Sequence, residues 1–103
     1  MSDGGLPVTW VGVATFDVHT PDARSKKDKR GVVTPLVERL RRRYPVSVAR
    51  LAGVDRLDRE TIGLVVINAD AAQCRSVLET ATAYAATFGA RVDAVRIDVE
   101  RWD

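Results

Sequence analysis

The sequence is poor in cysteine and histidine and lacks long apolar runs, and each shortage excludes a class of protein. Its 103 residues include one cysteine, Cys74, and one histidine, His19. A single cysteine cannot form an intramolecular disulfide and offers no metal-ligand spacing, which fits a reducing compartment. No run of about 18 apolar residues is present, so no membrane span is predicted.

The beginning of the sequence also lacks the basic start and apolar core of a secretory signal. Together these absences predict a cytoplasmic protein. Residues 1–7 are polar and glycine-rich, and we expect them to form a flexible N-terminus. The remaining residues, 8–103, are enough for one domain with a modest core, given that 46% of the sequence is hydrophobic.

Charge is segregated along the chain far more than the net charge of +2 indicates. Residues 24–50 hold ten of the sixteen Lys and Arg but only two acidic residues, so this segment carries +8 and the remainder −6. A cationic face of this kind can attract nucleic acid or an acidic protein surface. It can equally be a solvated helix face that keeps the protein soluble.

Residues 25–44 are predicted to form a basic amphipathic helix. At 3.6 residues per turn, its apolar residues fill one side and its charged residues the other. The exposed side carries the candidate nucleic-acid-binding residues Lys26, Lys27, Arg30, Arg41 and Arg42.

The ends of this helix are marked more clearly than its middle. Ser25 is predicted to cap it, with Asp28 returning the capping hydrogen bond. Pro35 would collide with the carbonyl of Gly31 in a straight helix, at a cost of about 3 kcal/mol. We favour a single helix bent near Gly31 over a second helix that begins at Thr34.

The apolar pattern predicts four strands and one further helix: residues 61–68 are apolar on both faces, as in a central strand, and the helix rests on helical spacing. Asp70 is expected to cap that helix with Gln73 returning the bond, and Gly89 to end it. The expected strands cover residues 8–19, 46–51, 61–68 and 92–101. The order βαββαβ predicts an α+β, ferredoxin-like two-layer sandwich, in which two helices cover one face of a four-stranded antiparallel sheet.

One face of this sheet should lack a helical cover. It would present Val11, Val13 and Thr15 beside an apolar set from residues 61–68, a patch that a small isolated domain seldom leaves exposed. We therefore predict a homodimer whose interface includes these three residues.

Candidate chemistry is sparse. Asp17 and His19 share one strand face and could pair, but the sequence places no nucleophile or further metal ligand with them. A structural pair is the more common arrangement, so their role stays open. No catalytic residue, metal site or cofactor is predicted, and the protein is expected not to be an enzyme.

Three segments resemble the YlxP-like family of uncharacterised bacterial proteins. They are residues 25–30 (SKKDKR), 46–49 (VSVA) and 59–63 (RETIG). The resemblance spans residues 11–98 and implies a ferredoxin-like fold and a context of translation initiation and ribosome maturation, without an established activity. Lys26 stands where the family usually has an apolar residue, and Leu57 where it often has an aromatic one.

Charge and resemblance together predict a small basic domain that acts in translation or ribosome maturation by binding RNA or a ribosomal particle. Residues 61–68 contain no aromatic side chain for base stacking, so contacts should run from the first helix to phosphates. The alternatives are a homodimeric scaffold that uses the open sheet face and, more weakly, a regulatory domain for a small ligand.

Overall fold

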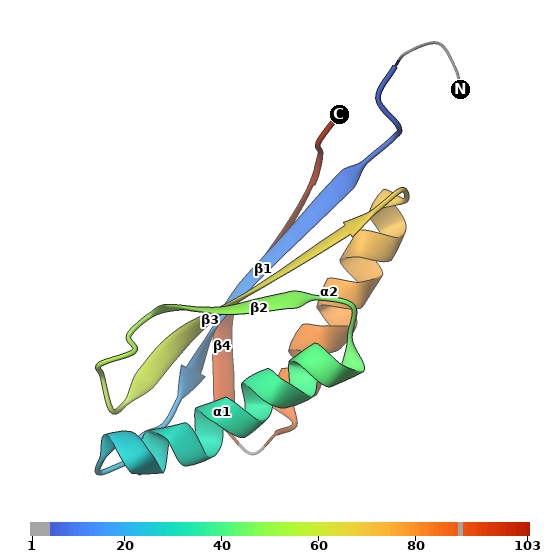
Figure 1. The fold of residues 1–103 in the computed structure, drawn as a ribbon. Coiled ribbons are helices and arrows are strands. Elements are labelled where there is room, and N and C mark those ends of the chain that lie inside the picture. The colour runs from blue at the N-terminus through green and yellow to red at the C-terminus, as the bar shows by residue number, and fades with distance from the viewer. Residues whose placement is uncertain (1–4, 89) are drawn as a thin grey trace.

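The computed structural model describes residues 5–88 and 90–103, and its elements follow the predicted order. Along the chain these are β1 (Trp10–His19), α1 (Lys26–Arg43), β2 (Ser47–Ala52), β3 (Arg59–Asn68), α2 (Ala71–Ala86) and β4 (Arg91–Arg101) (Figure 1). Each strand begins or ends within two residues of its predicted limits. The ferredoxin-like α+β fold is confirmed.

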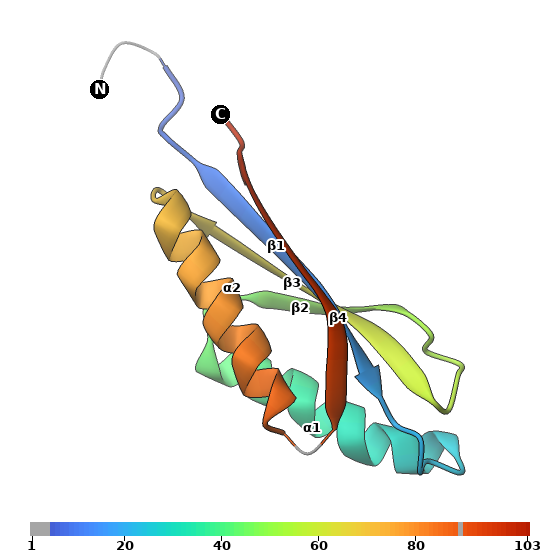
Figure 2. The ribbon, with the colours of Figure 1, turned by 180° about the vertical axis from the view of Figure 1, so that it is seen from behind.

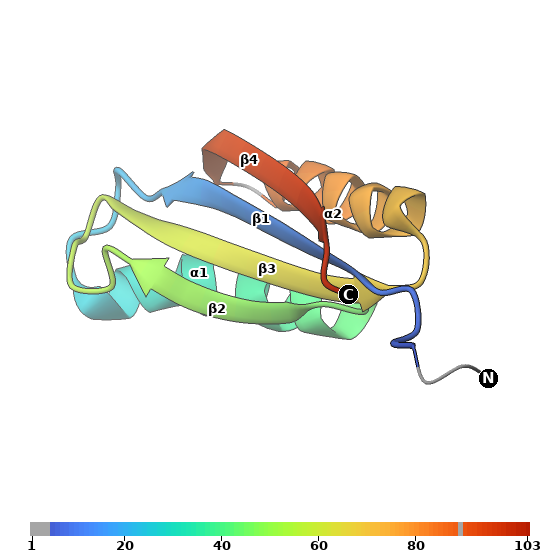
Figure 3. The same ribbon diagram turned by 90° about the horizontal axis from the view of Figure 1, so that it is seen from above.

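The four strands form one antiparallel sheet in the order β2-β3-β1-β4. The central strands β1 and β3 pair along their whole length, from Trp10 opposite Asn68 to His19 opposite Arg59. Both helices lie on the same side of the sheet, and the opposite face has no helical cover (Figures 2 and 3). The sheet therefore has one face in the core and one open face, as the connections require.

The core lies between the helices and the covered face of the sheet. In β1 and β3 the even-numbered residues point inward, because alternate side chains of a strand face opposite sides. The buried apolar side chains are Ala14, Phe16, Val18, Val33, Leu36, Val37, Leu40, Val48, Ile62, Leu64, Val66, Cys74, Leu78, Ala81 and Ala85. Cys74 is thus a core residue.

Helix α2 approaches β1 most closely at Gly12. A Cβ atom at that position would lie 2.8 Å from Leu78 Cδ1 and 3.3 Å from Cys74 Cβ. Only glycine leaves this space free, so Gly12 sets the distance between the helix and the sheet.

Both helices begin at the predicted capping residues, but the reciprocal bonds differ from the prediction. Ser25 Oγ accepts from the Asp28 N–H, whereas the Asp28 carboxylate accepts from the Arg24 N–H. Asp70 likewise accepts from the Ala72 N–H, while its own N–H donates to the Asn68 side chain instead of Gln73. The predicted return bonds were wrong: the Asp28 carboxylate binds the N–H one residue before the cap, and the Asn68 side chain takes the place predicted for Gln73.

Helix α1 continues through Pro35 without interruption, which confirms the single helix and excludes a separate start at Thr34. The bend expected near Gly31 stays a prediction. The predicted end of α2 at Gly89 falls outside the described residues, as does most of the predicted flexible segment 1–7. Within the described ranges, neither helix combines the length and apolar character that a membrane-crossing helix needs.

Strand β4 departs from regular alternation near its middle. The register between β1 and β4 shifts by one residue between Thr15 and Asp17, and Ala94 has a positive φ of 54°. Val95, which follows Ala94 at this β-bulge, is 49% exposed.

Candidate nucleic-acid interface

The exposed side of α1 carries the five predicted basic residues in two groups. The first basic group, Lys26, Lys27 and Arg30, lies in the first turns of the helix, and all three are exposed. The second basic group, Arg41 and Arg42, is also exposed and lies in the last turn. Eleven residues separate Arg30 from Arg41, so the groups are about 16 Å apart along the helix axis at 1.5 Å per residue.

The five residues differ in whether they already form ion pairs or hydrogen bonds within the protein. Within the described residues, Lys27 and Arg30 have no carboxylate partner, whereas Lys26 Nζ lies 3.5 Å from the exposed Asp55 carboxylate. Arg41 donates to the carbonyl of Val48 at 3.1 Å, and Arg42 lies 3.8 Å from Glu38 one turn earlier. Lys27 and Arg30 are therefore the cations most available to an external anion.

Two further arginines of α1 are held against α2 by aromatic rings. The Arg43 guanidinium lies 4.7 Å from the centroid of the Tyr84 ring, and that of Arg39 lies 5.6 Å from the Phe88 ring. Tyr44 packs edge-on against Tyr84 at 5.9 Å between centroids. The two arginine contacts are of the cation–π kind, and together with the tyrosine pair they join α1 to α2 and the residues that follow it.

Lys29 is the exception in the basic segment, because its side chain is buried. Its Nζ donates to the carbonyls of Gly53 at 2.6 Å and Arg56 at 2.5 Å, and it lies 3.3 Å from the Val54 carbonyl. It also lies 3.0 Å from Glu60 Oε1, with both side chains almost fully shielded from solvent. Lys29 thus attaches the loop between β2 and β3 to the first turns of α1.

A sequence signal for this burial existed and was missed. Lys29 precedes Val33 by four residues and Leu36 by seven, which is the spacing of the buried stripe of α1. In the sequence its acidic partner, Glu60, resembles a residue of the charged loop that precedes the third strand. It is instead the second residue of β3 and is buried.

Glu60 has a second cationic partner in Arg50 of β2. Both guanidinium nitrogens Nε and NH2 donate to its two carboxylate oxygens, the latter at 2.7 Å. Burial opposes the charged form of Glu60, but the hydrogen bonds from Arg50 and Lys29 outweigh it and hold the pKa of this carboxyl below its ordinary value. The cluster Lys29, Arg50 and Glu60 is therefore a charged, internally satisfied structural unit.

The open sheet face contains the three predicted interface residues. Val13 is 44% exposed, while Val11 and Thr15 are partly buried by their neighbours. Further exposed apolar side chains on the same face come from the neighbouring strand β3, which contributes Val65 and Ile67, and from the edge strand β2 beyond it, which contributes Leu51. The predicted apolar patch is present in this structure.

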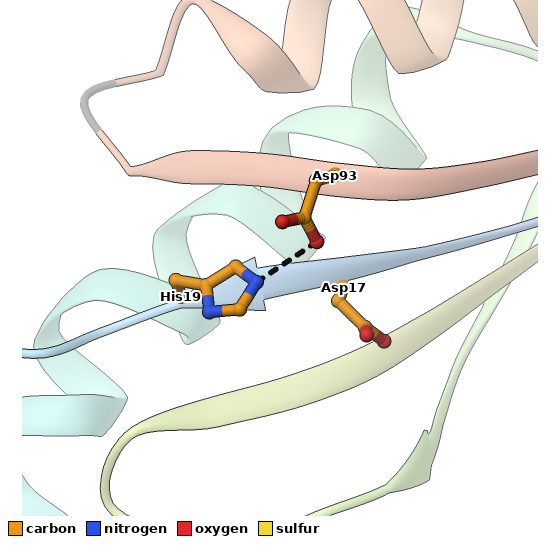
Figure 4. A group of neighbouring side chains, drawn as sticks. All are labelled: Asp17, His19 and Asp93. Carbon is orange, nitrogen blue, oxygen red and sulfur yellow. Dashed lines mark hydrogen bonds and ion pairs between the residues drawn. The ribbon is translucent and has the colours of Figure 1, made fainter.

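At one end of this face, Asp17 and His19 of β1 lie beside Asp93 of β4 (Figure 4). His19 Nε2 is 2.8 Å from Asp93 Oδ1, so histidine pairs across the strands and not with Asp17. Asp17 instead accepts a hydrogen bond from the Thr61 hydroxyl at 2.7 Å. Sequence reasoning could not supply Asp93, because the bulge in β4 determines which face that residue occupies.

The fold and its surfaces define a small ferredoxin-like α+β domain with a basic helix and an open sheet. The sequence profile of a family described as "Protein of unknown function (DUF503)" matches residues 11–101, and the chain belongs to this family. No curated protein matches the chain.

Solved structures resemble the chain at low sequence identity. The de novo designed protein Foldit4 is 14% identical, with 89% of this chain and 99% of that chain covered and a TM-score of 0.50. A C-terminal segment of the alpha subunit of aIF2 from Pyrococcus abyssi is 15% identical, with 97% and 53% covered and a TM-score of 0.49. The first likeness describes the fold alone, and nothing further rests on the second.

Proposed function

We propose that this protein is a non-enzymatic, cytoplasmic RNA-binding domain that acts in translation or ribosome maturation, with α1 as its binding surface, and that it belongs among the YlxP-like proteins. The observation that carries the binding proposal is the set of exposed cations on α1, of which Lys27 and Arg30 have no carboxylate partner within the described residues. The assignment to translation derives from the family resemblance.

Phosphate contacts are the mode of binding that this surface supports. The two basic groups lie along one helix, so they can follow a phosphate backbone, and flexible cationic side chains position a polyanion without reading its bases. The open face of β3 carries Thr61, Gly63, Val65 and Ile67, so it lacks the aromatic platform on which RNA-recognition sheets stack bases. Binding should therefore discriminate poorly between sequences and depend strongly on salt.

The test is charge reversal of the two unpaired cations, in the double variant Lys27→Glu/Arg30→Glu. Binding to a fluorescently labelled structured RNA is measured by anisotropy over a series of salt concentrations. In the parent, the logarithm of affinity should fall with the logarithm of salt at a slope of roughly −0.7 to −0.9 per phosphate contacted. The variant should bind all sequences more weakly and show a flatter slope.

A matched control changes the net charge equally at other surfaces. Arg75 of α2 and Arg96 of β4 are both exposed, and Arg75→Glu/Arg96→Glu should retain most of the affinity. Association with ribosomal particles is compared by co-sedimentation at constant ionic strength. If both double variants lose affinity equally, or neither loses any, α1 is not the binding surface.

The second candidate function is a homodimeric scaffold, and it is favoured by the apolar open sheet face. Val13 lies in the middle of this face on a central strand. A charged side chain introduced there would be buried without a partner in the dimer interface, which would prevent dimerisation. Light scattering after size exclusion should give the mass of a dimer at micromolar concentration, and Val13→Lys should give a monomer with unchanged circular dichroism. Ala83→Lys, on the exposed side of α2, is the control. A monomeric parent would remove the scaffold proposal.

A further inference from the structure

The bulge in β4 determines where Asp93 lies. Before the bulge, Arg96 is opposite Thr15, and after it Asp93 is opposite Asp17. Without the extra residue, Ala94 would be opposite Asp17 and Asp93 would be opposite Val18, with its side chain toward the core. The irregular backbone at Ala94 therefore brings a second carboxylate onto the open face beside His19.

This arrangement has an electrostatic cost. Carboxylates directly opposite each other on neighbouring strands repel, and such pairs destabilise a sheet. The basic side chains nearby compensate only loosely, since Arg59 NH1 lies 3.9 Å from Asp17 Oδ2 and Arg91 NH2 lies 3.7 Å from Asp93 Oδ2. A divalent cation between the carboxylates would neutralise both.

We propose that Asp17, His19 and Asp93 form a binding site for a divalent transition-metal ion of the Zn²⁺ type. One imidazole nitrogen and two carboxylate oxygens are ligands that zinc accepts, whereas Mg²⁺ and Ca²⁺ prefer oxygen ligands alone. Two carboxylates balance the charge of the ion. Three protein ligands leave a fourth position on the solvent side for water or an external ligand.

The distances permit this coordination with small side-chain movements. One donor atom from each residue lies within 4.8 Å of the others. Tetrahedral zinc sets its ligand atoms about 3.4 Å apart, from bond lengths of roughly 2.0 to 2.2 Å. His19 and Asp93, now 2.8 Å apart, would separate slightly to admit the ion.

Asp17 requires the larger adjustment. Figure 4 shows its carboxylate turned away from the facing pair His19 and Asp93. The Thr61 hydroxyl donates to Oδ1 of Asp17, so Oδ2 would be the ligand oxygen, and the ion would replace the loose contact of Oδ2 with Arg59 at 3.9 Å. The same hydrogen bond would then orient the carboxylate from the second coordination sphere.

The chain offers few competing ligands, so a direct experiment is possible. His19 is the chain's only histidine, and its only thiol, Cys74, is buried in the core. Protein without a polyhistidine tag is treated with a chelator, and ZnCl₂ is titrated by calorimetry at neutral pH. We expect one ion per chain, and His19→Gln and Asp93→Asn should each weaken binding by at least about tenfold, since loss of an outer-shell partner alone costs that much.

Two spectroscopic readouts identify the ligands. Zn²⁺ should shift the ring resonances of the single histidine in the parent, and Co²⁺ should give visible absorption bands of low coordination symmetry that His19→Gln removes. Asp98→Asn is the matched control, because Asp98 lies on the same strand and face but pairs with Arg96 at 2.9 Å. It should bind Zn²⁺ as the parent does.

Three results would overturn the proposal: no saturable zinc binding by the parent, equal binding by parent and His19→Gln, or binding of Mg²⁺ as tight as that of Zn²⁺. Circular dichroism confirms that each variant is folded. If Asp93→Asn does not fold, Asp17→Asn replaces it as the carboxylate variant. The RNA-binding proposal does not depend on any of these outcomes, because α1 contributes no ligand.

Discussion

Lys29 Nζ lies 3.0 Å from Glu60 Oε1, and this buried pair links the start of α1 to the start of β3. The ammonium group of Lys29 also donates to carbonyls of the loop between β2 and β3. The carboxylate of Glu60 also accepts hydrogen bonds from Arg50. Gly53, whose carbonyl accepts one of the hydrogen bonds from Lys29, has a φ of 75°, which favours glycine. The helix, the loop and the start of β3 are therefore all held by one cation, Lys29.

Replacing this cation with an apolar side chain of similar length should destabilise the protein strongly. Lys29→Met removes the donor from the carbonyls of Val54 and Arg56 and one of the two donors from that of Gly53. It also leaves Glu60 with only one of its two cationic partners. Breaking a buried ion pair from one side costs about 3 to 5 kcal/mol, and we expect the lower end because Arg50 remains. Urea unfolding followed by circular dichroism measures the loss.

Lys27→Met provides the control, because Lys27 is an exposed residue of the same helix turn. Its effect on the free energy of unfolding should stay within about 0.5 kcal/mol. Equal effects of the two substitutions would show that Lys29 is not buried as described. The pair also separates stability from RNA binding, since only Lys27 belongs to the proposed phosphate-binding surface.

Acid should destabilise the protein below about pH 4.5, because three carboxyl groups have lowered pKa values in the folded state. The pKa of Glu60 is lowered from 4.5 in the folded protein, so folding favours its charged form. That contribution is complete above about pH 4.5 and is lost as the pH falls through the folded pKa. Bidentate hydrogen bonds from Arg56 lower the pKa of Asp58 from 3.8 to about 2, and that of Asp103 falls equally beside Arg101.

The contributions of Asp58 and Asp103 are lost as the pH falls from about 4 towards 2. Urea midpoints measured between pH 6 and pH 2 should decline throughout this range. Asp58→Asn/Asp103→Asn should reduce the decline below pH 4 and leave the part above pH 4 unchanged. Asp22→Asn, an exposed substitution, should change neither part. A parent whose stability is independent of pH over this range would contradict the assignment.

The sequence predicted the parts of the fold that depend on local pattern. The apolar pattern identified the strands, and the order of elements fixed the central positions of β1 and β3. Ser25 and Asp70 were recognised as caps because their side chains bind N–H groups only two or three residues away. The continuity of apolar spacing on both sides of Pro35 correctly indicated one helix.

The parts that escaped prediction depend on contacts between distant segments. Lys29 and Glu60 are 31 residues apart, and either one alone looks like an ordinary surface charge. The basic segment also seemed to offer more free cations than it has, because Arg39 and Arg43 pack on rings from α2. Asp93 lies beside His19 only because of the β-bulge at Ala94, and no residue of β4 indicates a bulge there.

That bulge leads to the last prediction, Ala94→Gly. At a φ of 54°, an alanine side chain strains the backbone by roughly 1 to 2 kcal/mol, whereas glycine adopts this conformation freely. The greater chain entropy of glycine in the unfolded state offsets about 0.5 to 1 kcal/mol of the gain. We expect a net stabilisation of roughly 0.5 to 1 kcal/mol in urea unfolding.

The control, Ala83→Gly on the exposed face of α2, should instead lose about 1 kcal/mol, because α-helical backbone does not favour glycine. The bulge should persist in Ala94→Gly, so Asp93 should remain beside His19 and zinc binding should match that of the parent. If Ala94→Gly is as destabilising as Ala83→Gly, the backbone at Ala94 is not left-handed, and the register that places Asp93 opposite Asp17 is lost with it.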